Sequence, residues 1–96
     1  MSEITSFVSG HHVYKRIWTP LLGEELVARW NRSNPKDTRA IGVYRQGRLV
    51  GHAPREIKDR LFQHLQNGGT IKVIVQGGRN NTRHRGLELP ACFVLT

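Results

Sequence analysis

The sequence predicts a mostly β fold: a small six-stranded β-barrel, closed or nearly closed, with one main α-helix at about residues 55–66. Three observations lead to this prediction. Short apolar, β-prone segments alternate with turn residues along the chain. One stretch alone has clear helical periodicity. The 96 residues contain no internal repeat, low-complexity run or linker, so we expect a single domain over residues 1–96.

The first third of the chain is predicted to supply two strands. Residues 4–17 are β-prone, and we expect one long strand that is bent or interrupted near Gly10, where a glycine permits a bulge. Residues 18–23 form a loop with apolar anchors, and residues 24–30 alternate as a half-buried strand does. The two faces of that strand carry Leu26, Ala28 and Trp30 on one side and Glu25, Val27 and Arg29 on the other. A short helix over 24–30 is the competing interpretation.

A polar turn and a tight hairpin follow. The segment Asn34-Pro35-Lys36-Asp37 has turn chemistry, because Asn and Asp side chains bond to nearby backbone and proline fixes its own φ. Apolar, β-prone residues then predict strands at about 39–45 and 48–53. Gln46-Gly47 lies between them and is a short hairpin signal, since glycine readily takes a positive φ.

Residues 55–66 carry the helical pattern. Starting from Ile57, apolar residues fall at i, i+4, i+5 and i+8, which places them on one face of a helix. Pro54 fits the first turn of that helix. The helix is predicted to stop at Asn67-Gly68-Gly69, because glycine can take the left-handed conformation of a C-terminal cap.

The last third of the chain predicts two strands separated by a loop. In the segment 71–76, Ile71, Val73 and Val75 alternate with Lys72, Ile74 and Gln76, as in a half-buried strand. Residues 77–86 are polar and basic, and we expect a loop there. Residues 87–95 form the last strand, in which Pro90 suggests an edge position or a bulge because it has no N–H to donate.

The charge favours a polyanionic partner. The chain has 15 Lys and Arg residues against seven Asp and Glu, a net charge of +8, which is typical of nucleic-acid binding. A basic surface without such a partner is the alternative. Loops at one end of a barrel can converge, and a convergent cationic site suits a phosphate backbone. The basic residues near these loops are Lys15, Arg16, Arg29, Arg32, Lys36, Arg39, Arg55, Arg79, Arg83, His84 and Arg85.

Single-strand binders also use aromatic side chains on which bases stack. Trp18 is the best candidate for such a platform, with Tyr14 and Trp30 behind it. The structural alternative is that Trp18 packs under its own loop and that Trp30 faces the core beside Leu26.

Three sequence blocks resemble the HIRAN domain family. They are N-P-x-D at residues 34–37, A-I-x-V at residues 40–43 and V-G-H-x-P-R-E at residues 50–56, and their spacing matches as well. The resemblance covers most of the chain. It implies an OB-like β-barrel that captures the 3′ end of single-stranded DNA.

By this resemblance, a pocket receives the free 3′-hydroxyl and the terminal base. The matching positions are Arg16, Asn34, Asp37, His52 and Arg55. Asp37 is then the acceptor for the hydroxyl, and His52 and Arg55 lie beside a backbone phosphate. The Asn34 turn therefore has two interpretations: a purely structural turn in which Asp37 satisfies backbone N–H groups, or a turn that also faces a ligand.

The chain departs from the family pattern at Lys36, where the DNA-binding member has a tyrosine, and the 77–86 loop has no aromatic residue. Base stacking is thereby weakened and charge strengthened. The predicted nucleic-acid-binding residues are Arg16, Trp18, Asn34, Lys36, Asp37, His52, Arg55 and Arg79.

Catalytic and metal sites are not predicted. The five histidines have no metal-ligand spacing and Cys92 has no second cysteine, so we expect no metal, no cofactor, no disulfide and no enzyme activity. We see no signal peptide and no apolar run of roughly 20 residues that would span a membrane. An intracellular location follows, nuclear if the source is eukaryotic.

We therefore predict a non-enzymatic module that binds single-stranded DNA, with another nucleic acid as a variant of the same interpretation. One alternative is a protein–protein interaction module that keeps the fold without the 3′-end pocket, as Lys36 suggests. Another is an accessory domain in a larger helicase or nuclease assembly, in which partner proteins supply the chemistry.

Overall fold

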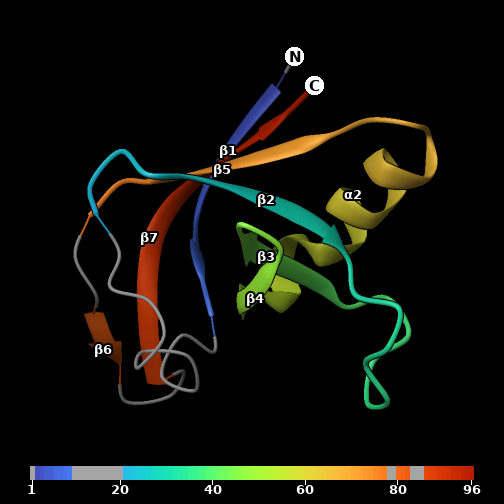
Figure 1. The fold of residues 1–96 in the computed structure, drawn as a ribbon, viewed down its shortest axis with the longest axis horizontal. Coiled ribbons are helices and arrows are strands. Elements are labelled where there is room, and N and C mark those ends of the chain that lie inside the picture. The colour runs from blue at the N-terminus through green and yellow to red at the C-terminus, as the bar shows by residue number, and fades with distance from the viewer. Residues whose placement is uncertain (1, 10–20, 78–79, 83–85) are drawn as a thin grey trace.

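One antiparallel sheet and the helix α2 make up the part of the chain that the structure, a computed structural model, describes: residues 2–9, 21–77, 80–82 and 86–96 (Figure 1). The elements are β1 (Ser2–Val8), β2 (Glu25–Trp30), β3 (Ile41–Arg45), β4 (Arg48–His52), α2 (Arg55–Gln66), β5 (Ile71–Val75), β6 (Asn80–Thr82) and β7 (Gly86–Leu95). The alternative of a helix over 24–30 is wrong, because β2 occupies this segment.

The sheet follows the order β1-β7-β5-β2-β3-β4, and the short strand β6 pairs with β7 beside this path. Its two outer strands, β1 and β4, approach one another at a single point. There Ser9 and His52 form an isolated antiparallel bridge: the Ser9 N–H donates to the His52 carbonyl at 2.8 Å, and the His52 N–H donates to the Ser9 carbonyl at 2.9 Å. Within the described residues this bridge is the only β-pairing between the outer strands, so the sheet is not closed by a continuous ladder.

The predicted fold class is confirmed: the chain is mostly β and OB-like, with the helix at the predicted position. The six predicted strands lie on the main path of the sheet, and β6 is an addition within the segment 77–86 that was expected to be a loop. β6 pairs with β7 from Asn80 opposite Glu88 to Thr82 opposite Gly86. β1 begins at Ser2, earlier than expected, and the rest of the predicted strand 4–17 lies outside the described residues from position 10 onward.

The core lies on the inner face of the sheet. Residues alternate between the two faces of a strand, and the inward set is fully apolar. Among the described residues, Phe93 of β7 is the largest that is fully buried. The other members of the core are Val8, Leu26, Ala28, Ile41, Val43, Val50, Ala53, Leu61, Ile71, Val73, Val75, Leu89, Ala91 and Leu95.

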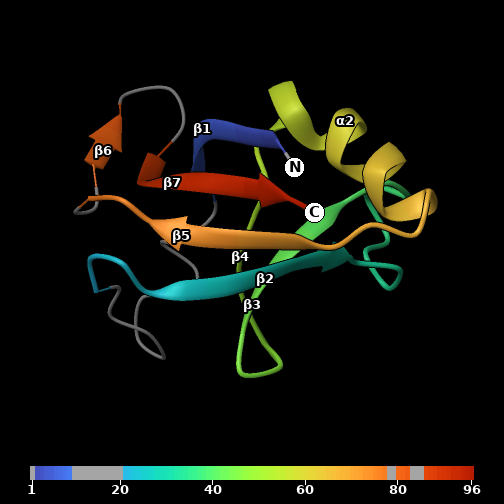
Figure 2. The same ribbon diagram turned by 90° about the horizontal axis from the view of Figure 1, so that it is seen from above.

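The helix α2 covers one end of the sheet beside β2 and β3, as both ribbon views show (Figures 1 and 2). Its apolar face is the predicted one: Leu61 is fully buried, and Ile57, Phe62 and Leu65 pack against the core. Among the described residues, none of the helical structure has the length and apolarity needed to cross a bilayer.

Both ends of α2 follow from local sequence. Pro54 is the N-cap residue, one position earlier than the predicted first turn, with an extended φ of −69° and ψ of 156°. It supplies no side-chain acceptor to the helix start. At the other end, Gly68 has φ +86°, and the N–H of Gly69 donates to the carbonyl of His64 at 3.1 Å. The predicted glycine stop is confirmed.

The hairpin between β3 and β4 turns at Gln46 and Gly47, with φ values of 51° and 82°. Two successive positive φ values match the turn type whose twist suits a two-residue hairpin. The turn places β4 so that it ends at His52, next to the start of α2.

The predicted edge position of Pro90 is wrong. β7 is an inner strand that pairs with β1 on one side and with β6 and then β5 on the other. Pro90 lies between the residues paired with β6 (86–88) and those paired with β5 (91–95). Its carbonyl accepts the Gln76 N–H at 2.9 Å, just past the end of β5, and its nitrogen faces the same side. The missing N–H therefore falls in a gap between two ladders.

Candidate nucleic-acid interface

A pocket of about 150 Å³ lies where the turn after β2, the end of β4 and the first turn of α2 meet. Its lining residues are Asn34, Asp37, Ala40, Ile41, His52, Ala53 and Lys58. Pockets for small-molecule ligands typically measure about 300–1,000 Å³. This pocket is smaller, so it suits one terminal chemical group rather than a whole nucleotide.

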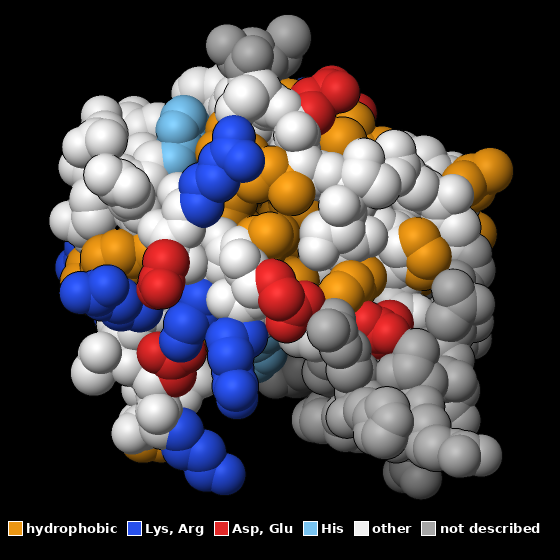
Figure 3. All heavy atoms as spheres, turned by 180° about the vertical axis from the view of Figure 1, so that it is seen from behind, with side chains coloured by type: hydrophobic (Ala, Val, Ile, Leu, Met, Phe, Trp, Pro, Cys, Tyr) orange, Lys and Arg blue, Asp and Glu red, His pale blue; other side chains and the backbone are white. Residues whose placement is uncertain are grey.

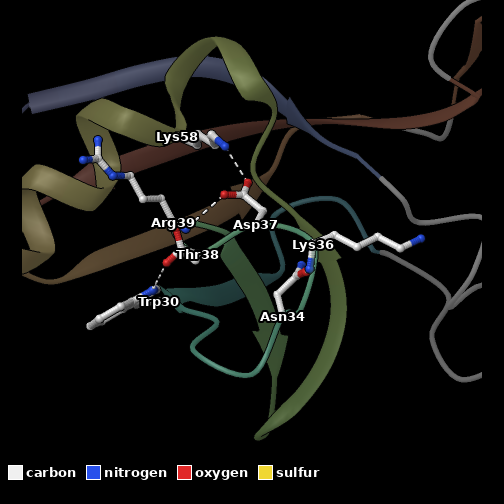
Figure 4. A network of polar contacts seen from close by, with 7 residues as sticks. All are labelled: Trp30, Asn34, Lys36, Asp37, Thr38, Arg39 and Lys58. Atoms are coloured by element: carbon white, nitrogen blue, oxygen red, sulfur yellow. Dashed lines mark hydrogen bonds and ion pairs between the residues drawn. The ribbon is translucent and has the colours of Figure 1, made fainter.

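The turn that forms one wall is built by two Asx-type contacts (Figure 4). Asn34 Oδ1 accepts the N–H of Lys36 at 2.9 Å, and Asp37 Oδ1 accepts the N–H of Arg39 at 3.0 Å. These local bonds hold both side chains in fixed orientations. Asn34 and Asp37 also line the pocket, so the turn that these bonds hold is at the same time a wall of the pocket.

Lys58 of α2 completes the charge arrangement. Its Nζ donates to Asp37 Oδ2 at 2.5 Å, and the two side chains are 24% and 34% exposed. The hydrogen bond from Lys58, followed by that from the Arg39 N–H, lowers the pKa of the Asp37 carboxyl below its ordinary value. Asp37 is therefore a carboxylate at neutral pH, paired with an ammonium.

Aromatic contacts hold the turn after β2 against α2. Trp30, the last residue of β2, meets Phe62 of α2 edge-to-face with ring centroids 5.2 Å apart. Its indole N–H donates to the Thr38 carbonyl at 2.9 Å. The guanidinium of Arg32 lies 4.6 Å from the Trp30 ring centroid, and that of Arg39 lies 5.5 Å from the Phe62 centroid. Trp30 is half-buried, so its ring is mainly an anchor for the turn.

His52 belongs to the sheet through its backbone and to the pocket through its ring. Its Nε2 lies 3.4 Å from Nδ2 of Asn31, which is itself buried, and Asn31 Oδ1 accepts the hydroxyl of Ser33 at 3.2 Å. With the amide nitrogen of Asn31 as the donor, Nε2 of His52 is the acceptor, which the neutral imidazole permits. Burial lowers the pKa of His52, and the negative charge of Asp37 opposes that shift. The neutral imidazole is therefore the resting form.

The lowered pKa values of His52 and Asp37 predict that the free energy of unfolding decreases as the pH is lowered. His52 and Asp37 both have folded-state pKa values below their ordinary values of 6.5 and 3.8, so the unfolded chain binds protons more readily. The His52 contribution is complete above pH 6.5 and is lost as the pH falls through its lower folded pKa; the Asp37 contribution is lost below pH 3.8.

We expect the urea midpoint to fall between pH 7.5 and pH 5, and the fall to be smaller in the His52→Gln variant. Equal pH profiles for the two proteins would contradict the assignment to His52.

The structure brings together three of the eight predicted site residues: Asn34, Asp37 and His52 share the pocket. Lys36 is exposed and extends away from Asp37 (Figure 4), and Arg55 is exposed at the first position of α2 without lining the pocket. The other three, Arg16, Trp18 and Arg79, lie outside the described residues.

Sequence reasoning missed Lys58. Its position on α2 placed it among the solvated residues of an amphipathic helix, and its partner Asp37 is 21 positions away in the chain. No periodicity connects two residues so far apart. The available signal was weaker: a lysine in the first turn of a helix that starts beside a pocket histidine.

Exposed cations lie on the elements that form the pocket, the turn after β2 and the helix α2. On the face shown in Figure 3, Lys and Arg side chains gather on the side of the molecule that carries α2, with Asp and Glu among them and part of one His between them. The exposed cations from this part of the chain are Arg32, Lys36, Arg39, Arg55 and Arg60. Such a surface attracts a phosphate backbone in a salt-dependent way. Among the described residues, no three His, Cys, Asp or Glu side chains are placed to share a metal ion.

Comparison with known proteins gives one family and two similar structures. The family model of the HIRAN domain matches residues 5–90. The crystal structure of the HIRAN domain of human HLTF is similar with a TM-score of 0.78 and 22% identity, covering 97% of this chain and 74% of that one. A crystal structure of a Lactobacillus plantarum protein gives a TM-score of 0.64 and 17% identity, covering 96% and 95%. No curated protein sequence matches the chain.

Proposed function

The chain belongs to the HIRAN domain family, and we propose from this that it binds single-stranded DNA by capturing the 3′ end of the strand. HIRAN domains are DNA-binding modules and are not catalytic by themselves. The net charge of +8 supports a nucleic-acid partner. DNA binding in general is supported by the family and the charge. The further proposal, that the domain recognises the end of a strand, depends on the pocket.

The observation that carries the proposal is the pocket in which Asn34, Asp37 and His52 meet. A carboxylate has about four acceptor positions, and Asp37 uses one on each oxygen, for Arg39 N–H and for Lys58. Acceptor positions remain for a hydroxyl donor. A 3′-hydroxyl is such a donor, and an internal nucleotide of DNA has none on its sugar. The small volume of the pocket also favours a terminal group.

The surroundings suit the phosphate that precedes a terminal sugar. α2 starts beside the pocket, and the N-terminal end of a helix carries partial positive charge that favours an anion. Arg55 is exposed at that helix start. We assign to these groups the backbone phosphate, with His52 on the pocket side.

The experiment is fluorescence anisotropy at about 150 mM salt, where generic charge attraction is strongly screened. A linear single strand with a free 3′-hydroxyl is compared with a circular strand of the same composition. We expect the linear strand to bind at least about tenfold more tightly, the size expected for a hydrogen bond to a charged group. Asp37→Ala and His52→Ala should each reduce that preference and leave the circular dichroism spectrum unchanged.

Asp59→Ala is the matched control for Asp37→Ala. It removes the same charge from an exposed position on α2 outside the pocket, so the preference for the linear strand should persist. Equal binding of linear and circular strands by the unmodified protein would overturn end capture and leave a basic surface. Normal binding by both pocket variants would overturn the pocket assignment.

A second candidate function is that of a protein-interaction module, which a different surface of the domain supports. A groove of about 550 Å³ lies on the outer face of the sheet, with apolar residues of β2, β5 and β7 such as Val27, Ile74 and Val94. Val27 is 42% exposed although it is apolar. In this interpretation the domain is an accessory part of a helicase or nuclease assembly, in the nucleus if the source is eukaryotic, and acts in DNA repair. A well-folded protein that binds neither linear nor circular strands would favour it.

A further inference from the structure

We propose that Lys58 extends the ligand range of this pocket, so that it accepts a strand whose 3′ end carries a phosphate monoester as well as one with a free hydroxyl. The inference rests on the proposed function, because it assigns a substrate class to the same pocket. Lys58 is then a specificity-determining residue, and the relevant chemistry is that of a terminal phosphate.

The first argument is the balance of hydrogen-bonding groups in the pocket. Lys58 has three ammonium N–H groups and uses one for Asp37, which leaves two without an acceptor among the described residues. Asn34 uses its Oδ1 for the Lys36 N–H, which leaves the donor group Nδ2 without such a partner. On the acceptor side, each oxygen of Asp37 already accepts one hydrogen bond, which leaves about one acceptor position on each, fewer than the remaining donor N–H groups of Lys58 and Asn34. Donors are in excess, and a phosphate monoester offers acceptor oxygens.

The second argument is charge. A lone carboxylate in the pocket would repel a phosphate, since like charges at short range disfavour one another. Asp37 is not alone, because the Lys58 ammonium is bonded to it. The pair has no net charge, and His52 is neutral at rest, so the pocket as a whole presents no negative charge to an incoming phosphate. The exposed cations of the turn after β2 and of α2 add attraction.

The third argument is size. A single water needs about 10–15 Å³ by the same measure, so a pocket of about 150 Å³ has room for several waters. A phosphate group, with its few heavy atoms, fits this volume, whereas a hydroxyl leaves most of it to water. Lys58 reaches the pocket from the first turn of α2 and Asn34 from the opposite turn, so donors approach from two sides.

The test measures anisotropy at about 150 mM salt for one strand sequence with a 3′-hydroxyl, the same strand with a 3′-phosphate, and a circular strand. The unmodified protein should bind the two linear strands within about threefold of each other. Lys58→Met should leave the affinity for the hydroxyl-ended strand unchanged. It should lower the affinity for the phosphate-ended strand by about tenfold or more, the loss expected for a hydrogen bond to a charged group. Asp37→Ala should do the reverse, weakening the hydroxyl-ended strand only.

Lys72→Met is the matched control. It removes the same charge from the outer face of the sheet, where Lys72 pairs with Glu25 at 2.8 Å, and should leave the ratio of the two affinities unchanged. Lys58→Gln replaces Lys58→Met if the latter does not give the wild-type circular dichroism spectrum.

Rejection of the phosphate-ended strand by more than about tenfold in the unmodified protein would overturn the inference and leave end capture intact. Equal losses for both ends in Lys58→Met would overturn it too, because Lys58 would then contribute charge without selectivity. If neither linear strand binds more tightly than the circular one, the proposed function fails and the inference fails with it.

Discussion

Replacement of Phe93 with alanine is expected to lower the free energy of unfolding by about 3–5 kcal/mol. Phe93 is the largest fully buried residue in the described part of the chain, and it lies in β7 between Ile4 of β1 and Val73 of β5. Removing the ring loses its burial and leaves a cavity lined by three strands, which close-packed neighbours fill only in part. A domain of this size has a total stability of about 5–15 kcal/mol, so the loss is a large fraction of the whole.

Urea unfolding followed by circular dichroism measures this loss, through the shift of the midpoint at constant slope. Phe93→Leu is the milder companion variant for the case in which Phe93→Ala is unfolded from the start, with an expected loss below about 1.5 kcal/mol. Cys92→Ala is the neighbouring control: its side chain points to the other face of β7, and no large group is removed. A Phe93→Ala loss no greater than that of Cys92→Ala would contradict the assigned core.

Gly51→Ala is expected to reduce stability by about 1–3 kcal/mol and to weaken end binding as well. A Cβ atom at Gly51 would lie 2.4 Å from Val8 Cγ1 and 3.0 Å from the Ser9 carbonyl oxygen. Val8 is fully buried and the second contact is backbone, so neither yields easily. β4 must therefore move away from the end of β1. Because His52 follows Gly51 directly, its ring moves with the strand.

Two measurements on one variant check this expectation: the urea midpoint and the preference for a linear over a circular strand. Gly77→Ala is the control, because a Cβ there would meet Pro90 Cγ at 3.5 Å, an ordinary contact, and should change neither quantity. If Gly51→Ala keeps both wild-type values, close approach of β4 to β1 is not required for the pocket.

Local signals predicted most of the fold. The helix was predicted at its observed bounds, because its apolar spacing and the glycines after Gln66 are properties of adjacent residues. The alternation in β5 was equally local. Of the two positions predicted for Pro90, an edge or a bulge, the edge was wrong because a proline is excluded only where its N–H is needed, and that depends on where β5 and β6 end beside it. β6 was missed because Asn80-Asn81-Thr82 has no apolar alternation and gains its partner only from β7.

The candidate site was predicted in part for a similar reason. Asn34, Asp37 and His52 came from the family resemblance, and the structure places all three in one pocket. The turn chemistry of Asn34 and Asp37 could be read from adjacent residues, whereas the ion pair with Lys58 required two elements to pack together. Whether a lysine on a helix surface is solvated or bonded to a pocket carboxylate is decided by that packing alone.

The bridge between Ser9 and His52 connects a residue of the pocket to the end of β1. In the described part of the chain one residue pair makes the backbone pairing between the outer strands β1 and β4, and so short a pairing is a low-cost place for local opening. A ligand that holds the His52 ring holds the same residue whose backbone makes that bridge. A ligand in the pocket would therefore stabilise the pairing of β1 with β4. The amide hydrogens of Ser9 and His52 would then exchange with solvent more slowly. Binding of a DNA end in the pocket and pairing of β1 with β4 would then stabilise one another.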